Sequence, residues 1–342
     1  MKKKLLTAAV AGALTVGMGV ANADVKIFGH LDESILAWDI DGSGDDINLT
    51  CTTCSVGFKG SEDLGNGLKA IFKLDFQFDI NNRNVGAITD RDQWVGLAGE
   101  GWGSIKFGSI SSGYKSTGAM IDPVYRTVAQ ARSMGLQSRL HLGAGEEGQG
   151  RMTNHVRYDS PSMSGFKVIV DYVFDSTEGD GENDNPWNLT GLYKNGPVLV
   201  FGSYITTSRG GNDDAWKIGG SFQINDEAKV FAQYENDGGL LNSYGTSTAD
   251  GGDVWHIGGT YTMGSNTIYA AYGQGDDNSG TGANTAEYQT FSIIGIHGFS
   301  KRTLAYLGYI NVDCDGTAGP VCGSRTQAGE ADYVALGIKH KF

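Results

Sequence analysis

Apolar and polar side chains alternate along many short segments of this chain, which is the pattern of a β-strand with two different faces. Residues 166–175 and 216–223 show it clearly, and residues 68–79 show it over the longest stretch. In that stretch one side carries Leu68, Ala70, Phe72, Leu74, Phe76 and Phe78, and the other carries Lys69, Lys73, Asp75, Gln77 and Asp79. We predict strands with one apolar side and one side that faces water.

The connections between these segments are of two kinds, which alternate along the chain. Seven are short and contain turn residues, at 63–67, 99–103, 162–165, 194–197, 225–227, 264–266 and 300–302. Eight are longer and polar, near 39–53, 80–90, 109–153, 175–186, 208–214, 236–252, 275–286 and 313–330. This count predicts about sixteen strands, with tight turns at one end and long loops at the other, an arrangement typical of outer-membrane barrels.

Residues 333–342 form another two-faced segment, in which Val334, Leu336 and Ile338 share one face and Lys339 and Lys341 share the other. A strand in this position leaves an open sheet edge unless it pairs with another strand. The simplest partner is the first strand, near residues 25–35, and this pairing would close a barrel. The apolar face of each of these two strands is interrupted once, in the first by Glu33 and in the last by His340.

Charged residues along one face distinguish a membrane barrel from a soluble sandwich. A lysine that faces lipid at the bilayer midplane costs about 2 to 4 kcal/mol, so the two lysines of residues 68–79 have to face water. A sandwich would bury the apolar faces in its core instead, and periodicity alone is compatible with that arrangement. About sixteen strands enclose a lumen wide enough for water. We therefore predict an all-β fold, a transmembrane antiparallel β-barrel.

Composition supports a single exported barrel domain. The chain has 53 glycines but only 5 prolines among 342 residues, which suits unbroken strands joined by many turns. Residues 1–23 have a basic start, an apolar core and a small-residue end at Ala21-Asn22-Ala23, the pattern of a secretory signal peptide, so the barrel is expected to occupy residues 24–342. The formal net charge of -13 makes nucleic acid an unfavourable partner.

Three motifs resemble those of the trimeric general-diffusion porins of Gram-negative outer membranes. They are the segment 55–72, which contains Gly-Phe-Lys-Gly-Ser-Glu-Asp, the segment Arg91-Asp-Gln-Trp-Val-Gly-Leu, and the segment Val156-Arg-Tyr-Asp-Ser-Pro. The resemblance covers essentially the whole mature chain and implies sixteen strands, a homotrimer and a third loop folded into each lumen. It also implies that the terminal Phe342 is read by the barrel assembly machinery, and that Ser55 stands where the family usually has an inward-facing arginine.

The long connection at 109–153 is the expected constriction loop. Its formal charge is +2, because Lys115, Arg126, Arg132, Arg139 and Arg151 outnumber Asp122, Glu146 and Glu147 by five to three. We expect it to face Lys69, Lys73, Arg91, Lys106 and Arg157 on the wall. Charges across a waist of roughly a Debye length, about 8 Å, are only partly screened, so this basic waist favours a weak anion preference. The acidic outer loops would oppose it by attracting cations.

Four cysteines in an exported chain favour disulfides. Cys51 and Cys54 belong to the first loop and Cys314 and Cys322 to the last, so local pairs are expected, with pairing between the two loops as the alternative. Residues 39–46 resemble the start of a calcium loop, with oxygen ligands at Asp39, Asp41, Ser43 and Asp45, but Thr50 stands where a bidentate glutamate is expected. No cofactor is predicted beyond loosely bound Ca²⁺ at such acidic loops, which could be shared with lipopolysaccharide and outer-membrane lipid.

The predicted function is an outer-membrane channel for passive diffusion of small hydrophilic solutes and ions. Enzyme motifs are not evident: the segment 108–113 lacks the Gly-x-Ser-x-Gly spacing, and His-Glu-x-x-His does not occur. Two alternatives remain open. A solute-specific channel would show saturable block of its conductance, and a surface adhesin or structural barrel would conduct little.

Overall fold

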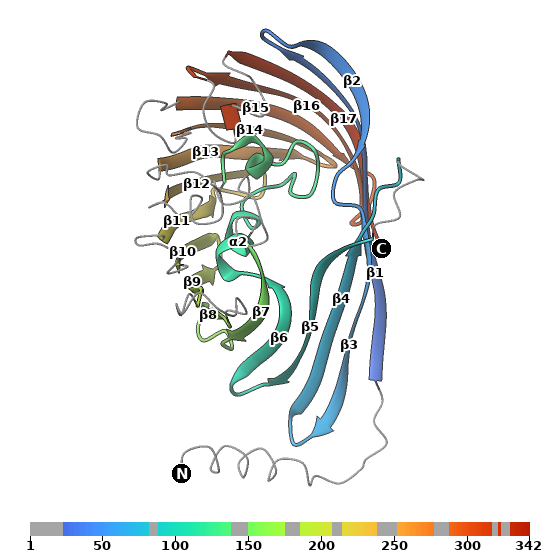
Figure 1. Cartoon of the computed structure of the whole chain (residues 1–342), viewed down its shortest axis with the longest axis vertical. Helices are drawn as coiled ribbons and strands as arrows, with labels where there is room; N and C mark the ends of the chain where they lie inside the picture. Colours follow the sequence, from blue (N-terminus) through green and yellow to red (C-terminus); the bar gives the residue numbers. More distant parts are fainter. Residues whose placement is uncertain are drawn as a thin grey trace, which may run out of the picture.

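The computed structural model describes residues 23–81, 88–137, 150–174, 185–206, 214–237, 252–276, 287–316, 321–322 and 329–342. These residues form one closed antiparallel sheet (Figure 1), built from β1 (Ala23–Ile40), β2 (Gly44–Cys51), β3 (Ser55–Gly65), β4 (Leu68–Gln77), β5 (Thr89–Gly99), β6 (Gly103–Ser111), β7 (Arg151–Asp159), β8 (Phe166–Val173), β9 (Trp187–Asn195), β10 (Val198–Thr206), β11 (Asp214–Gln223), β12 (Ala228–Asp237), β13 (Gly252–Met263), β14 (Asn266–Asp276), β15 (Glu287–Gly298), β16 (Thr303–Cys314) and β17 (Glu330–Lys341). Two short helices, α2 (Gly113–Gly118) and η1 (Ala131–Met134), lie between β6 and β7.

The seventeen segments make a barrel of sixteen strands, because β2 and β3 are two parts of one strand. Both pair with β1: residues 44–51 lie opposite residues 40–33, and residues 55–62 lie opposite residues 30–23. Between them, Thr52, Thr53 and Cys54 face only two residues of β1, so one extra residue bulges from the ladder. The expected sixteen-stranded barrel is therefore confirmed.

The first and last strands close the barrel. Residues 30–40 of β1 pair with residues 341–331 of β17, and Gly29 and Phe342 exchange two backbone hydrogen bonds of 3.0 and 3.2 Å. The side chain of Phe342 lies against Gly29, whose missing Cβ leaves room for the ring. The predicted pairing of the two ends is thus present.

All seven predicted turns join consecutive strands at one end of the barrel, and the longer connections leave from the strand ends opposite to these turns. The prediction of a first loop at 39–53 is wrong. Strands β1 and β2 continue to a three-residue turn, Asp41–Ser43, in which Gly42 has φ 76°. The polar residues concealed this extension, since Asp39 and Asp45 lie opposite each other in the hairpin and read as loop in the sequence. The first connection is therefore a tight turn.

The two faces of each strand behave as the alternation predicts. In β17, Val334, Leu336 and Ile338 are 46, 51 and 51% exposed on the outside, whereas Lys339 is 4% exposed and points inward. Glu33 and His340 do lie on the outer face, where the His340 Nδ1 is 2.9 Å from the Thr303 hydroxyl. Among the described residues, none of the helices has the length and apolar character needed to cross a membrane.

The inner face of strands β10 and β13–β17 is mainly apolar or uncharged, with Lys339 as an exception, whereas β12 adds the buried carboxylates of Glu235 and Asp237 to Phe231. Phe201, Phe231, Ile294 and Ile310 point inward and are 0 to 3% exposed. This explains residues 198–201, which are apolar on both faces: Phe201 faces the interior rather than lipid. These side chains are covered by the segment between β6 and β7, which Figure 1 shows inside the curve of the sheet.

Candidate constriction site inside the barrel

The connection between β6 and β7, here called L3, comprises residues 112–150, of which 112–137 and 150 are described. It begins at α2, where the Ser112 hydroxyl accepts the Lys115 backbone N–H at 3.1 Å. The Gly113 N–H donates to the Asp171 carboxylate at 2.8 Å, and the Tyr114 N–H donates to the Asn188 side chain at 3.1 Å. L3 thus starts firmly attached to β8 and β9.

The Tyr114 side chain attaches L3 to two further strands of the wall, β11 and β12. Its hydroxyl donates to the Glu235 carboxylate at 2.8 Å, and the Lys217 ammonium lies 4.3 Å from the centre of its ring. All three side chains are almost fully buried. Burial and the nearby Glu235 carboxylate raise the pKa of Tyr114 well above its ordinary value, so the hydroxyl stays protonated and remains a donor.

The other described end of L3 is held by the apolar half of the barrel. The Thr290 hydroxyl donates to the Met134 carbonyl at 3.1 Å, the Tyr288 hydroxyl donates to the Gly135 carbonyl at 2.6 Å, and the Gln233 amide donates to the Gln137 carbonyl. Apolar side chains of L3, namely Ile121, Val124, Ala129 and Met134, join the same buried cluster. These contacts come from β12 and β15.

Arg126 attaches L3 to the part of the wall formed by β1 and β3. Its guanidinium donates to the Ser55 hydroxyl at 2.8 Å, to the Thr53 carbonyl at 2.9 Å and to the Thr53 hydroxyl at 3.1 Å. Its own carbonyl lies 2.9 Å from the His30 Nε2, and the Lys339 ammonium donates to the Tyr125 carbonyl. One loop therefore contacts inward side chains from around the whole barrel, which places it in the lumen.

The wall that faces Arg126 carries a network of opposite charges centred on Asp92. The Lys73 ammonium lies 2.9 Å from one Asp92 oxygen, and the Arg151 Nε lies 3.2 Å from the other. The Ser111 hydroxyl also donates to Asp92, at 2.8 Å. Beside it, Arg91 contacts the Asp75 carboxylate at 3.3 Å.

A β-bulge brings Arg91 and Asp92 to the same side of the sheet. Leu74 lies opposite Gln93 and Phe76 lies opposite Asp90, so Asp75 alone faces two residues of β5. Regular alternation would have sent one of the two charged side chains into lipid. Asp92 was not among the predicted site residues, and the sequence offered only its place directly after Arg91 as a signal.

A second charged cluster lies on β6–β8. The Asp159 carboxylate contacts Arg157 at 2.9 Å, Lys106 at 2.8 Å and Lys167 at 2.9 Å, and the His155 Nε2 lies 2.8 Å from Asp171. In the sequence, Asp159 stands out only as part of the 156–161 motif, which gives no signal of this role. Because three cations share this carboxylate, the cluster keeps a positive balance.

Burial is the main cause of the shifted pKa values of the charged side chains on L3. Desolvation, followed by the nearby Arg151 and Arg132, lowers the pKa of Lys115 well below its usual value. Desolvation and Arg91 lower the pKa of Arg126 to about 10, which still leaves it charged at neutral pH. Burial raises the pKa of Asp122 to about 6, although its oxygens accept the N–H groups of Val124 and Ala131 at 3.0 Å each.

The predicted site residues therefore fall into groups. Lys73, Arg91 and Arg151 surround Asp92, and Arg151 stands at the start of β7 rather than in the loop. Lys106 and Arg157 belong to the Asp159 cluster, and Asp122, Arg126 and Arg132 lie on L3. Lys69 is exposed beside the turn at Asn66 and does not join these clusters. Arg139, Glu146 and Glu147 lie outside the described residues.

Both cysteine pairs form disulfides within the described residues. Cys51 and Cys54 are joined where the second barrel strand is broken, and Cys314 is joined to Cys322 at the loop end of β16. The first pair therefore lies in the wall of the barrel, although the sequence suggested a loop. The calcium candidates Asp39, Asp41, Ser43 and Asp45 are spread along the β1–β2 hairpin, and no group of three or more His, Cys, Asp or Glu side chains in the described ranges is arranged to hold a metal ion.

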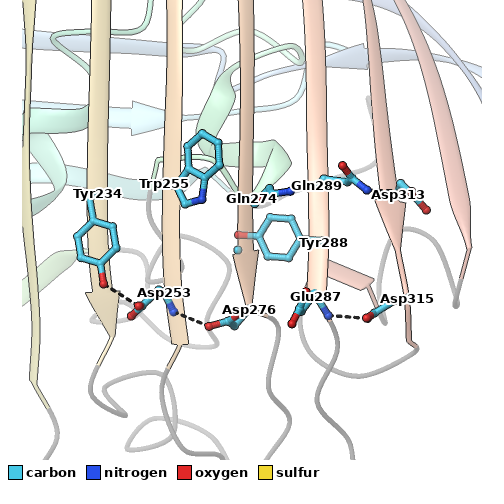
Figure 2. A pocket seen from close by; sticks show the side chains of 11 residues that line it. Tyr234, Asp253, Trp255, Gln274, Asp276, Glu287, Tyr288, Gln289, Asp313 and Asp315 are labelled. Atoms are coloured by element: carbon cyan, nitrogen blue, oxygen red, sulfur yellow. Dashed lines mark hydrogen bonds between the residues drawn. The ribbon is translucent and has the colours of Figure 1, made fainter.

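The outer face of the barrel carries aromatic rings next to carboxylates at the loop end of the strands. Figure 2 shows this for β12–β15: the Tyr234 hydroxyl donates to Asp253 at 2.6 Å, the Asp253 N–H to Asp276 at 3.1 Å, and the Glu287 N–H to Asp315 at 2.6 Å. Trp255 projects outward beside them. A cavity of about 390 Å³ lies among these residues. Amphipathic rings at this level are typical of a membrane interface.

A closed barrel of sixteen antiparallel strands, apolar outside, charged inside and narrowed by an inward loop, defines a porin. The sequence agrees: the chain belongs to the family described as Gram-negative porin, which it matches over residues 6–317. It is an outer-membrane protein that forms a channel for passive diffusion.

Comparison with single proteins supports this assignment. The chain is 28% identical over its whole length to the whole of outer membrane porin protein 32 of Delftia acidovorans. It is 31% identical over 60% of its length to an outer membrane porin protein of Bordetella pertussis, of which it spans 59%. Among solved structures, the chain is similar to the anion-selective porin from Comamonas acidovorans, with a TM-score of 0.77 and 21% identity. The match covers 94% of this chain and 100% of that porin chain.

Proposed function

We propose that this porin is a diffusion channel with a weak preference for anions. The observation that carries the proposal is the chemistry around two L3 arginines. Within the described residues, the guanidinium of Arg126 donates hydrogen bonds only to Thr53 and Ser55, and that of Arg132 only to Gln130, all of them uncharged groups. A charge held by neutral partners keeps its field, which acts on a permeating ion.

Carboxylates near the constriction are more fully compensated. Asp92 lies between Lys73 and Arg151, and Asp75 lies within 3.6 Å of Lys73 and 3.3 Å of Arg91. Arg132 lies 4.5 Å above the Tyr125 ring, and its Nη1 is buried with no hydrogen-bond partner among the described residues. The local balance therefore favours anions. The acidic groups on the outer rim act in the opposite direction, so the net preference should be weak.

The reversal potential in a salt gradient tests this proposal. The purified protein would be inserted into a planar bilayer with KCl at different concentrations on the two sides. The reversal potential should have the sign of a small excess of chloride permeability over potassium permeability. A strongly cation-selective potential would contradict the proposal, and saturable block by one solute at low concentration would favour a solute-specific channel instead.

We further propose a homotrimer that contacts lipopolysaccharide and depends on the barrel assembly machinery through Phe342. Support for the trimer comes from family membership and from a structural match, with a TM-score of 0.66, to an OmpT of Vibrio cholerae in trimer form. The solutes would be small and hydrophilic. Native mass spectrometry in detergent tests the oligomer, and the outer-membrane yield of a chain lacking Phe342 tests the assembly role.

A further inference from the structure

Strand β3 begins at Ser55, and a guanidinium from a distant part of the chain lies against this residue. It belongs to Arg126 of L3 and donates to the Ser55 hydroxyl at 2.8 Å. Ser55 is fully buried under it. We propose that Thr53, held in the Cys51–Cys54 bulge, and Ser55 are positioning residues that fix Arg126 on the wall, so that this loop arginine sets the channel's ion preference.

The bulge supplies the acceptors that a regular strand would not. Thr53 has φ 54°, in the left-handed region that a threonine rarely adopts. Its carbonyl and hydroxyl both point toward Arg126 and accept at 2.9 and 3.1 Å. In an unbroken antiparallel ladder, the strand carbonyls would be used by the neighbouring strands. The extra residue between β2 and β3 thus frees an acceptor for a charged side chain.

The disulfide encloses the bulge. Cys51 and Cys54 flank Thr52 and Thr53, and Cys54 is fully buried. The backbone on both sides is pinned, because the Thr52 N–H donates to the Asp32 carbonyl at 3.1 Å and the Phe78 N–H donates to the Cys54 carbonyl at 3.0 Å. Without the covalent link, the extra residue would remain, but residues 52–54 could adopt other bulge conformations. The disulfide therefore helps to maintain the unusual conformation of Thr53.

The L3 side of the contact is fixed as well. Arg126 has φ 62°, again in the left-handed region. Its N–H donates to the Gln130 side chain at 3.0 Å, and its carbonyl lies 2.9 Å from the His30 Nε2. The backbone of the loop tip and the backbone of the wall are thus both held in uncommon conformations that face each other. This arrangement restrains the guanidinium from two directions.

The inference refines the proposed anion preference, and the experiment separates the two. Five forms would be compared with the wild type: Arg126→Gln, Ser55→Arg in the Arg126→Gln background, the double variant Cys51→Ser with Cys54→Ser, that double variant combined with Arg126→Gln, and the control double variant Cys314→Ser with Cys322→Ser. The measurement is the reversal potential in a KCl gradient. Gel mobility before and after heating would confirm that each barrel is folded.

We expect Arg126→Gln to lower the chloride-to-potassium permeability ratio by about twofold or more, because a unit charge at the waist is only partly screened. Ser55→Arg should restore the ratio, since it returns the charge to the same place from the wall. Loss of the Cys51–Cys54 link should lower the ratio in the wild type but change nothing further in Arg126→Gln. The control should match the wild type.

Other outcomes would overturn the inference. If Arg126→Gln leaves the ratio unchanged, Arg126 does not set the preference. If loss of the Cys51–Cys54 link shifts the ratio equally with and without Arg126, or if Ser55→Arg fails to restore it, the positioning role is wrong. The absolute sign of the wild-type potential tests the proposed anion preference separately, because the differences between variants do not depend on that sign.

Discussion

The two halves of the inner wall differ in chemistry although both are made of the same kind of strand. Strands β10 and β12–β17 present buried apolar side chains such as Phe201, Phe231 and Ile310. Strands β3–β8 present charged side chains, which are arranged around Asp92 and Asp159. L3 lies between these two halves of the wall. Its apolar side chains pack on the apolar half, and its Arg126 contacts the charged half.

This difference shows how a loop can shape a water-filled channel. The hydrophobic effect holds L3 against one wall, at about 25 cal/mol for each Å² of apolar surface that is buried. Polar contacts add to this attachment, including those of Tyr114 with Glu235 and of Arg126 with Ser55. Because the partners of the Arg126 guanidinium are uncharged, its positive charge is not cancelled where it is held. One half of the wall determines where the loop lies, and the other half determines which ions pass it.

The largest effect is expected when a charge is placed in the apolar half. Ile121→Asp would put a carboxylate at a fully buried position of L3, and an uncompensated buried charge costs about 3 to 5 kcal/mol. The loop should leave the wall, so single-channel conductance should rise and become noisier. Met120→Asp is the matched control, because Met120 is 43% exposed on the same loop. Equal conductance of the two variants would show that apolar packing does not hold L3.

Removing the central carboxylate of the charged half should have a somewhat smaller effect. Asp92→Asn leaves Lys73 and Arg151 without their shared anion, which should destabilise the barrel by about 1 to 3 kcal/mol and increase anion preference. Thermal unfolding and the reversal potential would measure the two changes. Asp226→Asn, in the exposed turn between β11 and β12, is the control. An unchanged reversal potential would mean that permeating ions do not feel the charges around Asp92.

Asp122 lies where L3 packs on the apolar half and should make the preference depend on pH. Burial raises its pKa to about 6, so the neutral form is favoured in the folded protein. Its contribution to stability is fully present below about pH 3.8 and is lost as the pH rises through about 6. Over the same range the new negative charge should reduce anion preference. The reversal potential measured from pH 5 to pH 7 should change more in the wild type than in Asp122→Asn.

The smallest effect is expected for a single polar anchor in the apolar half. Thr290→Val removes the hydroxyl that donates to the Met134 carbonyl and should cost about 1 kcal/mol. Thr262→Val, which loses a contact of 3.0 Å with the Thr267 hydroxyl on the same barrel, should cost a similar amount. Only Thr290→Val should increase current noise. If it also releases the loop completely, hydrogen bonds rather than apolar packing hold L3.

Much of the fold follows from alternation in the sequence, because lipid tolerates few exceptions on the outer face. The alternation in residues 68–79 and 333–342 predicted which side chains face outward and which face inward. The positions of the seven turns were also predictable. The period alone does not reveal a bulge. At Arg91 and Asp92, and again at Thr52 and Thr53, one extra residue changes which side chains share a face.

The constriction was less predictable than the barrel. The sequence identified the basic residues of L3 but not their partners, since contacts such as Arg126 with Ser55 span 71 residues. Inward apolar residues such as Phe201 also break the simple rule that apolar means lipid-facing, because a folded loop shields them from water. A pattern within one strand carries no information about a loop that packs on it from elsewhere in the chain.

The outer rim in Figure 2 has a consequence for how the barrel sits in its bilayer. Tyr234 and Trp255 occupy the outer face only one or two residues from Asp253 along or across the strands. A strand rises about 3.3 Å per residue, so sinking by even a few ångströms would carry carboxylates into hydrocarbon, and rising would lift the rings out of it. The rings and carboxylates thus define the position of the membrane interface on the barrel. This position fixes the depth at which the narrowest part of the channel is held.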